Sequence, residues 1–418
     1  MRHRLRILLA PGIGIKRWFA LFVLSLGLFG LGVAFVIAVP ISSKMLPVLR
    51  AITLGGFPPV VRGLVFILLG SGLGGLALYK FYRVFISGVQ LGNRRVDILT
   101  TLDQRRRLDH GLRIVAIGGG TGLSTVLRGL KRETSNLTAI VNISDDGGSS
   151  GRLRNDLNIP PPGDARNCLV ALSEAESLLE NLFNYRFKDD SSLDGHSLGN
   201  LLLAALHDMN GGFSESLDAA AQLLALSGRV VPVATDGNIV LMGVTTTGQV
   251  LNGESAVGQA PDQLARVWIE PEAAAANVVA LEAIQDASLI VIGPGSLYTS
   301  IIPNFLLNGM SEAVERSSAP KVFVCNVATQ PHETDGYGVR DHIEAFKAHS
   351  GVTVTHVVVN SDVAPLPKEW GQTPVAPESQ LDGVDYKVIQ ADVVDENLRT
   401  RHDPKKLASV LASVLRPG

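Results

Sequence analysis

The chain has 418 residues and a formal net charge of −2 at pH 7, a length that fits one large domain or two ordinary ones. Residues 1–113 hold 16 Lys and Arg against three acidic residues, whereas the rest of the chain holds 21 against 36. An acidic body behind a basic leader argues against nucleic acid as the partner of the body. The two cysteines, Cys168 and Cys325, lie far apart in apolar runs, which argues against a zinc site and predicts buried thiols in a reducing compartment.

The leader contains two apolar runs. Residues 18–39 are rich in Leu, Phe and Val and are long enough to cross a hydrocarbon core of ~30 Å as a helix. Residues 63–82 form a second run, which is shorter and rich in glycine. If both runs span, we expect Gly70, Gly74 and Gly75 to let the two helices pack closely.

Basic residues lie at both outer ends of this pair of runs, with Lys16 and Arg17 before it and Arg83, Arg94 and Arg95 after it. The positive-inside rule therefore predicts a membrane hairpin over residues 1–83 with both ends in the cytoplasm. The alternative is an interfacial or buried second run, in which case the body changes sides. The hairpin reading places the protein in the cell membrane as a multi-pass protein with a cytoplasmic main domain.

Residues 84–112 form a basic juxtamembrane connector, and residues 113–418 form the body. Short Val- and Ile-rich runs alternate there with helical patterns, which predicts a doubly wound α/β layer with a mostly parallel sheet. The expected strands are 113–117, 137–143, 229–234, 288–292, 321–325 and 353–359, and the expected helices are 123–132, 165–184, 199–210, 213–226 and 343–349.

Two features interrupt or end this alternation. Residues 238–254 indicate a hairpin that turns at Gly248, and residues 267–270 extend it into a small antiparallel insert. A last helix is expected to begin with Asp403 as its N-cap and Pro404 as its first residue.

A glycine loop follows the first strand of the body. Gly119, Gly120, Thr121 and Gly122 belong to a run that matches neither the dinucleotide pattern nor a P-loop. Glycine loops that open a helix present backbone N–H groups to anions, so we expect these residues to bind a phosphate. The alternative is a tight strand–helix turn.

A pair of carboxylates, Asp145 and Asp146, ends the second strand. Neighbouring carboxylates repel each other, so we expect Asp145 to bind magnesium, or one of the two to act as a catalytic base if the protein is an enzyme. Helix capping and a solvated turn are the alternatives. The residues that follow, Gly147, Gly148, Ser149 and Ser150, can form an anion-binding nest.

Further polar residues lie near the expected strand and helix ends. We expect a shared ligand-binding crevice that includes Arg166, His196, Asn200, Gly295, Ser296, Tyr298, Thr299, Asn304 and Asn326. Tyr298 either stacks on a base or packs beneath its loop. There is no nucleophile elbow, Cys–His pattern or HExxH motif, so a hydrolytic triad or a zinc enzyme is not supported.

These motifs together resemble the YvcK/CofD superfamily. The resemblance rests on GGGTGLS (118–124), DDGGSSGRLR (145–154), PPPGDARN (160–167), GHSLGNLLL (195–203), GPGSLYTS (293–300) and CNVATQ (325–330). It implies a Rossmann-like three-layer α/β/α body with a nucleotide-phosphate pocket lined by Gly119, Gly120, Gly122, Asp145, Asn200 and Tyr298. The two-helix leader departs from the compact members of the family.

The resemblance to the YvcK branch implies a gluconeogenesis factor, a regulator that binds UDP-N-acetylglucosamine or a related nucleotide diphosphate and supports cell shape and cell-wall homeostasis. A homo-oligomer and envelope-synthesis partners are also expected, and no nucleic acid. The alternative, from the CofD branch, is a magnesium-dependent 2-phospho-L-lactate transferase-like enzyme.

Overall fold

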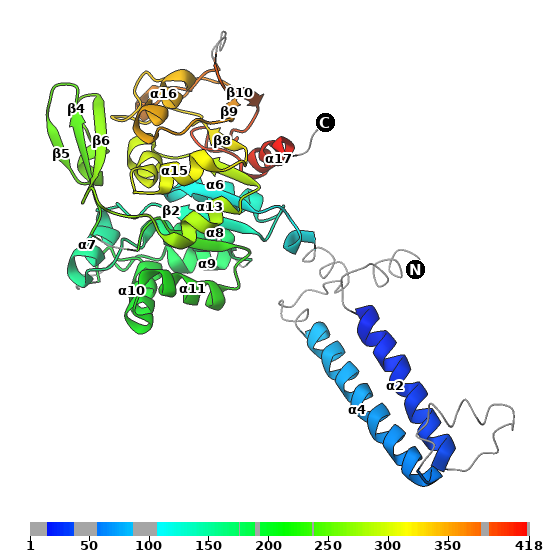
Figure 1. The fold of residues 1–418 in the computed structure, drawn as a ribbon. Coiled ribbons are helices and arrows are strands. Elements are labelled where there is room, and N and C mark those ends of the chain that lie inside the picture. Colours follow the sequence, from blue (N-terminus) through cyan, green and yellow to red (C-terminus); the bar gives the residue numbers. More distant parts are fainter. Residues whose placement is uncertain are drawn as a thin grey trace. The chain divides into compact units, whose positions relative to one another are not determined.

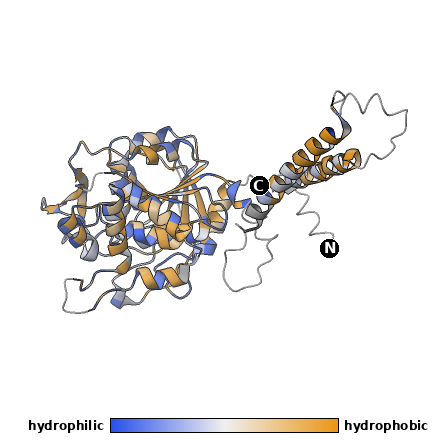
Figure 2. Ribbon diagram, turned by 90° about the horizontal axis from the view of Figure 1, so that it is seen from below, coloured by the Kyte–Doolittle hydropathy of each residue, from blue (hydrophilic) through white to orange (hydrophobic). Residues whose placement is uncertain are grey.

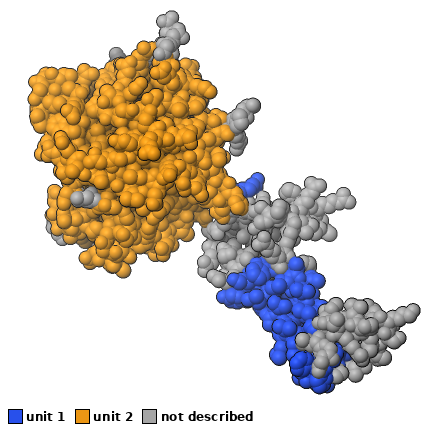
Figure 3. Space-filling model, in the orientation of Figure 1, with its two compact units in different colours: residues 1–107 blue, residues 108–418 orange. Residues whose placement is uncertain are grey.

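The structure is a computed structural model that describes residues 15–36, 57–86, 107–174, 176–188, 193–235, 238–377 and 384–415. Residues 1–107 and 108–418 form two compact units, which are coloured separately in Figure 3. Most of the expected connector, at residues 87–106, lies outside the described residues.

The first unit contains two helices that pack side by side, α2 (Ile15–Val36) and α4 (Pro59–Ile86). Both helices consist mainly of hydrophobic residues, coloured orange in Figure 2. Many of these residues are exposed, such as Leu68, which is 71% exposed. By length and composition, Val60–Lys80 is the one helical stretch among the described residues that is able to cross a membrane, while Ala20–Val36 is apolar but shorter. The second apolar run is therefore the better candidate span, although the sequence favoured the first.

Glycines bring the two helices together. A Cβ atom at Gly70 would lie 2.7 Å from the backbone nitrogen of Phe29, and one at Gly74 would lie 3.1 Å from Oγ of Ser25. The expectation for these two glycines is confirmed, because close backbone approach needs residues without side chains. The expectation for Gly75 is wrong, since nothing lies within 4 Å of a Cβ placed there.

The second unit is built on a seven-stranded parallel sheet with the order β10-β9-β8-β7-β1-β2-β3. Six of its strands confirm the expected ones, and β10 was missed. The strands are β1 (Ile114–Gly118), β2 (Leu137–Val141), β3 (Arg229–Pro232), β7 (Leu289–Ile292), β8 (Lys321–Val324), β9 (His356–Asn360) and β10 (Lys387–Ala391). The central strands are buried on both faces, as the Val- and Ile-rich runs predict.

Helices cover the sheet and complete a three-layer α/β/α body (Figure 1). Phe346 of α16 packs on Phe323 of β8 with a ring-centroid distance of 5.4 Å, and α6 packs against β1, β2, α8 and α17. The longer helices are α6 (Gly120–Leu130), α7 (Gly148–Leu157), α8 (Gly163–Leu172), α9 (Glu176–Phe183), α10 (Leu198–Asn210), α11 (Phe213–Leu224), α13 (Val278–Gln285), α15 (Met310–Arg316), α16 (Val339–Ser350) and α17 (Pro404–Val414).

The structure corrects the expected helix over residues 165–184, which is two helices, α8 and α9. The chain leaves the helical path at Ser173, which forms a bridge with Leu226. The last helix is confirmed, because the Asp403 side chain accepts hydrogen bonds of 2.8 Å from the backbone N–H groups of Lys405 and Lys406. Both cysteines are buried, as expected, and neither forms a disulfide.

The antiparallel insert is also confirmed. It consists of β4 (Val240–Thr245), β5 (Val250–Asn252) and β6 (Leu264–Glu270) in the order β5-β4-β6, and the chain turns at Gly248, where φ is +88°. A short helix, α12 (Glu254–Val257), follows β5. In Figure 1 the small sheet stands at the left edge of the body.

Candidate functional site

The strand order reverses between β1 and β7. From β1 the chain builds outward through β2 and β3, then returns to place β7 on the other side of β1. Open α/β sheets bind ligands beyond the carboxyl ends of the strands at such a switch point. The loops that leave β1 and β7 there are the two glycine loops identified in the sequence, at residues 119–122 and 293–296.

A cavity of about 460 Å³ lies between these loops and the loop after β8, and we call it the glycine-loop pocket. Its walls are mainly small and uncharged, which suits close approach of a backbone to a ligand. It is lined by Gly119, Gly120, Thr121, Gly122, Thr125, Pro294, Gly295, Ser296, Ser300, Asn326, Ala328, Thr329, Gln330, Gln372, Thr400, Arg401 and His402.

Arg401 is the charged side chain among these lining residues, and it is exposed. His402 is neutral near pH 7, because burial lowers its pKa to about 4 while Nε2 bonds the carbonyl of Cys325 at 3.1 Å. The pocket therefore has one permanent positive charge beside a ring of backbone and amide groups.

Tight contacts fix the two glycine loops against each other. A Cβ atom at Gly122 would lie 2.1 Å from the carbonyl oxygen of Pro294. Asn326 holds the second loop, because its Oδ1 accepts from Gly295 N–H at 3.1 Å and its Nδ2 donates to Gly295 O at 2.8 Å. Asn326 thus positions the loop as well as lining the pocket.

Glu333 is a buried carboxylate beneath the second loop. It accepts hydrogen bonds from the hydroxyls of Ser296 and Thr299, at 2.8 and 3.0 Å, and from the Tyr298 N–H at 3.1 Å. Burial raises its pKa, and these hydrogen bonds oppose that rise. The two hydroxyls therefore already have a partner in the protein.

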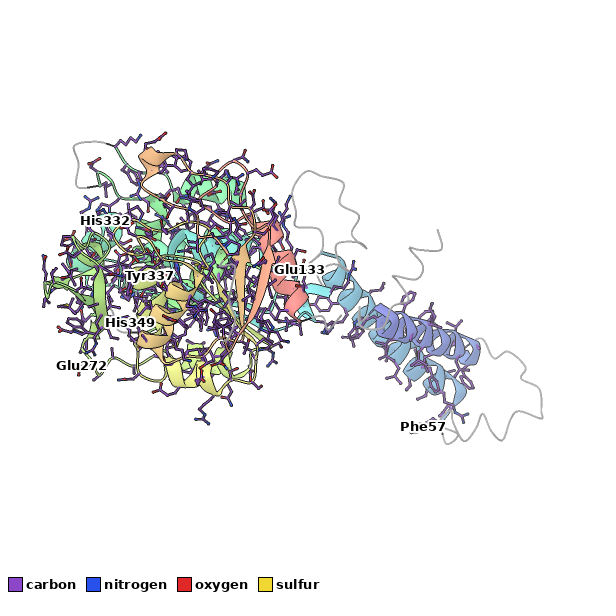
Figure 4. The ribbon with its side chains drawn as sticks, turned by 90° about the horizontal axis from the view of Figure 1, so that it is seen from above. Phe57, Glu133, Glu272, His332, Tyr337 and His349 are labelled. Atoms are coloured by element: carbon purple, nitrogen blue, oxygen red, sulfur yellow. The ribbon has the colours of Figure 1, made fainter. Side chains whose placement is uncertain are left out.

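Tyr298 packs beneath its loop. It is 2% exposed, its hydroxyl lies 2.8 Å from the hydroxyl of Tyr337, and its ring meets His349 edge-on at 5.5 Å; Figure 4 labels Tyr337 and His349. Burial raises the pKa of this phenol, so the hydroxyl stays protonated. Of the two interpretations of Tyr298, the geometry favours the packing role.

Asn304 is also buried behind the glycine loops. Its Nδ2 donates to the carbonyls of Ser300 at 2.8 Å and of Gly118 at 3.4 Å, while Oδ1 has no hydrogen-bond partner among the described residues. Thr299 and Asn304 are almost fully buried and line neither this cavity nor the one described next.

A second, smaller cavity of about 170 Å³ lies at the loop after β2, and we call it the serine-loop pocket. It shares no lining residue with the glycine-loop pocket, so the expected single crevice is two cavities. Its lining residues are Asp145, Gly147, Gly148, Ser149, Ser150, Gly163, Asp164, Arg166, Asn167, Arg186 and Asn200.

Hydrogen bonds order the polar wall of this second pocket. The Ser149 hydroxyl lies 3.0 Å from Nδ1 of His196 and accepts from Nδ2 of Asn200 at 3.1 Å. Arg166 donates to the Ser197 hydroxyl at 2.6 Å and to Oδ1 of Asn200 at 3.2 Å. His196 therefore lies behind the pocket wall and contacts the Ser149 hydroxyl, whereas Asn200 and Arg166 line the pocket.

The two carboxylates that end β2 have different surroundings. Asp145 lines the serine-loop pocket and accepts from Gly147 N–H at 2.9 Å, and burial raises its pKa. Asp146 instead accepts from the backbone N–H and the hydroxyl of Ser255, at 2.9 and 2.5 Å. Asp146 therefore holds the first turn of α12 in the insert, a contact between residues 109 positions apart.

Two acids near the site that sequence reasoning did not place there, Asp164 and Glu254, hold their protons well above the usual carboxyl range. Burial and the nearby Asp145 raise the pKa of Asp164 to about 7, and Gly120 N–H bonds its carboxyl. Asp164 is the second residue of α8, whose N-cap residue is Pro162. Burial, followed by Asp145, raises the pKa of Glu254 to about 8.

The other lining residues that sequence reasoning missed are Asn167, Arg186, Gln372, Thr400, Arg401 and His402. Arg401 and His402 lie directly before the expected N-cap of the last helix, which is the one local signal that could have drawn attention to them. Arg186 lies in an irregular segment and carries no such signal. Among the described residues, no group of three or more His, Cys, Asp or Glu side chains is arranged to hold a metal ion.

The strand order and the two glycine loops define a Rossmann-like α/β protein with glycine loops at its switch point. The chain belongs to the CofD family, because the family model described as 2-phospho-L-lactate transferase CofD matches residues 114–397.

Relatives of the same family are known from several bacteria. The gluconeogenesis factor of Halalkalibacterium halodurans is 44% identical over 71% of this chain and 95% of its own length, and that of Bacillus subtilis is 42% identical over 73% and 98%. A relative from Nostoc sp. is 39% identical over 96% of this chain and 91% of its own length, so that alignment reaches into the leader.

A crystal structure of a UPF0052 family member from Bacillus halodurans has the same fold. It superposes with a TM-score of 0.68 at 42% sequence identity and covers 72% of this chain and 99% of its own. The similarity of fold therefore extends over most of the body.

Proposed function

We propose that the protein is a regulator whose glycine-loop pocket binds a nucleotide diphosphate sugar, with UDP-N-acetylglucosamine as the leading ligand. The observation that carries this proposal is the pocket at the β1–β7 switch point, which combines glycine-loop N–H groups with the single charge of Arg401. Backbone N–H groups and a guanidinium together suit a diphosphate. The amides of Asn326, Gln330 and Gln372 offer donors and acceptors to a base or a sugar.

Calorimetry with the purified protein tests the proposal. We expect saturable binding of UDP-N-acetylglucosamine, weaker binding of UDP and little binding of uridine, because the phosphates carry the charge that Arg401 recognises. Absence of binding by any nucleotide sugar at millimolar concentration would overturn the proposal. A role in cell shape and cell-wall homeostasis, with envelope-synthesis partners and a homo-oligomeric state, belongs to the same proposal.

We also propose that α2 and α4 anchor the protein in the cell membrane with the body in the cytoplasm. The apolar stretch Val60–Lys80 and the close packing of α2 along α4 support a hairpin. Lys80 and Arg83, in the last turns of α4, favour a cytoplasmic body. Resistance to alkaline extraction of membranes is expected, together with activity of a cytoplasmic reporter fused after residue 418. Release by alkali would contradict the anchor.

A second candidate function is a magnesium-dependent transferase of the CofD type. It is favoured by Asp145 and Asp164, two carboxyls with raised pKa values whose residues line the same small pocket. Protein Mg²⁺ sites use one or two carboxylates and complete the shell with phosphates and water, so this pair fits the ion without a third acidic ligand. Bound Mg²⁺ would neutralise phosphate charge and polarise the transferred group.

In that reaction Asp145 would hold the ion, whereas Asp146 is engaged with Ser255. Mass spectrometry after incubation with nucleotide diphosphate donors and acceptor alcohols would detect a transferred phosphoester. Turnover that needs Mg²⁺ and is lost in Asp145→Asn would support the transferase, and absence of any product would count against it.

A further inference from the structure

The serine-loop pocket receives the N-termini of two helices. Both α7, which begins at Gly148, and α8, which begins at Gly163, are ten residues long, and neither has a side chain that caps its first turn. The first N–H groups of each helix have no partner within the helix, and the helix dipole adds partial positive charge there. At Gly148 φ is +49°, a conformation that favours glycine and turns the chain into α7.

Two guanidinium groups line the same cavity. Arg166 is 7% exposed, and its Nε has no hydrogen-bond partner among the described residues. Burial, followed by the nearby charge of Arg186, lowers the pKa of Arg166, and the charges of Asp164 and Asp145 oppose this. Within the described part of the chain neither arginine forms a salt bridge with a carboxylate; their recorded bonds go to neutral oxygens. Two like charges this close repel each other, and Asp164 and Asp145 compensate only in part, since the pKa of Arg166 stays lowered.

The two acidic residues of the pocket, Asp145 and Asp164, are bonded elsewhere. Asp145 accepts from Gly147 N–H on its own loop, and Asp164 turns toward the wall that separates the two pockets, where Gly120 N–H bonds it. Within the described residues neither acid is hydrogen-bonded to Arg166 or Arg186, so the remaining donors of these arginines and of the two helix N-termini can bind a ligand.

We propose that the serine-loop pocket is a second anion site, which binds the phosphate group, or another tetrahedral oxyanion, of a second ligand. The two cavities share no lining residue, so a nucleotide in the glycine-loop pocket leaves this one accessible. The inference rests on the proposed function only in placing the nucleotide in the glycine-loop pocket. The second ligand is either an acceptor substrate or an effector that carries a phosphate.

Inorganic phosphate is the probe, titrated calorimetrically into the purified full-length protein. We expect saturable binding that weakens about tenfold in Arg186→Gln, the loss typical of one charge-assisted hydrogen bond. Arg186→Lys keeps the charge and is expected to bind more tightly than Arg186→Gln. Arg152→Gln is the matched control, because Arg152 is an exposed residue of α7 that does not line the pocket.

Arg401→Gln separates this site from the nucleotide site. We expect it to weaken UDP-N-acetylglucosamine binding and leave phosphate binding unchanged, while Arg186→Gln does the reverse. Phosphate binding without nucleotide binding would overturn the proposed function and leave the second site intact. The second site is overturned if phosphate does not bind, if folded Arg186→Gln binds it as the wild type does, or if saturating UDP-N-acetylglucosamine displaces it.

Discussion

The Asp164 carboxylate lies against the backbone of Gly119, where a Cβ atom would sit 2.5 Å from Oδ2. Gly119 lines the glycine-loop pocket and Asp164 lines the serine-loop pocket. This contact is therefore part of the wall between the two cavities. Residue 119 must lack a side chain so that the two loops can pack this closely. The protonation state of Asp164 determines the charge on the wall of the serine-loop pocket.

The raised pKa of Asp164 predicts a pH-dependent stability. Between about pH 4 and pH 7 the folded protein retains a proton that the unfolded chain has released, so the free energy of unfolding falls as pH rises. Asp164→Asn removes this contribution, and its stability relative to the wild type is expected to rise across the same range. Each pKa unit corresponds to about 1.4 kcal/mol. Denaturant unfolding at pH 5 and pH 7 measures the difference; a constant offset would contradict the assignment.

Gly122 and Gly118 allow a comparison of two glycines near the switch point, one tightly packed and one with space around it. A Cβ atom at Gly122 would overlap Pro294 O, whereas at Gly118 the nearest atom is 3.7 Å away. Gly122→Ala is expected to cost about 2 kcal/mol of unfolding free energy through overpacking against backbone, and Gly118→Ala much less. Thermal unfolding of both variants checks this ranking. Equal losses would mean that the loops do not pack this closely.

Arg401→Gln is expected to weaken binding of UDP-N-acetylglucosamine about tenfold without changing stability, because an exposed side chain loses one charge-assisted contact. Arg399→Gln serves as the control, since Arg399 pairs with Asp362 and does not line the pocket. Calorimetry of both variants gives the comparison. Equal weakening by the two changes would mean that Arg401 contributes only its long-range charge and makes no specific contact with the ligand.

Asp146→Ala is expected to loosen the insert. Its Oδ1 holds the backbone N–H and the hydroxyl of Ser255, and loss of such a cap typically costs about 1 kcal/mol. Hydrogen exchange should therefore speed up around residues 253–258. Asp262→Ala, which removes a partner of Thr247 in the same insert, should leave that segment unchanged. Unaltered exchange in Asp146→Ala would assign Asp146 another role.

The packing of α2 on α4 predicts a specific cross-link. A Cβ atom at Gly74 would lie 3.7 Å from Cβ of Ser25, which suits a disulfide. The double variant Ser25→Cys/Gly74→Cys should oxidise readily, as measured by loss of maleimide-reactive thiols. Ser25→Cys/Gly75→Cys should stay reduced, because nothing lies within 4 Å of a Cβ at Gly75. Equal oxidation of the two pairs would mean that α2 and α4 do not pack through Ser25 and Gly74 in particular.

The sequence predicted the central strands well, because short runs such as Leu289–Ile292 are apolar throughout when buried on both faces. It missed β10 (Lys387–Ala391), an edge strand whose half-exposed residues break that pattern. The break between α8 and α9 was also missed, since it depends on the pairing of Ser173 with Leu226, which are distant in sequence.

In the candidate site, too, the sequence predicted the residues that belong to local motifs and missed those that depend on tertiary structure. A glycine loop can be recognised from adjacent residues alone, so the sequence predicted Gly119 and Gly122 as site residues. Arg401 was not, because its place beside them depends on strand order rather than on nearby sequence. Tyr298 was assigned to the ligand from its place in a glycine turn, but a local motif does not reveal that its hydroxyl pairs with Tyr337.

The glycine-loop pocket joins residue 119 to residue 401, and this has a consequence for biosynthesis. Contacts between residues so distant in sequence form late in folding. During translation the β1 loop leaves the ribosome long before the segment that carries Arg401, so a nascent chain cannot complete the pocket. Occupancy of this pocket by a ligand would therefore distinguish finished molecules from chains still being synthesised.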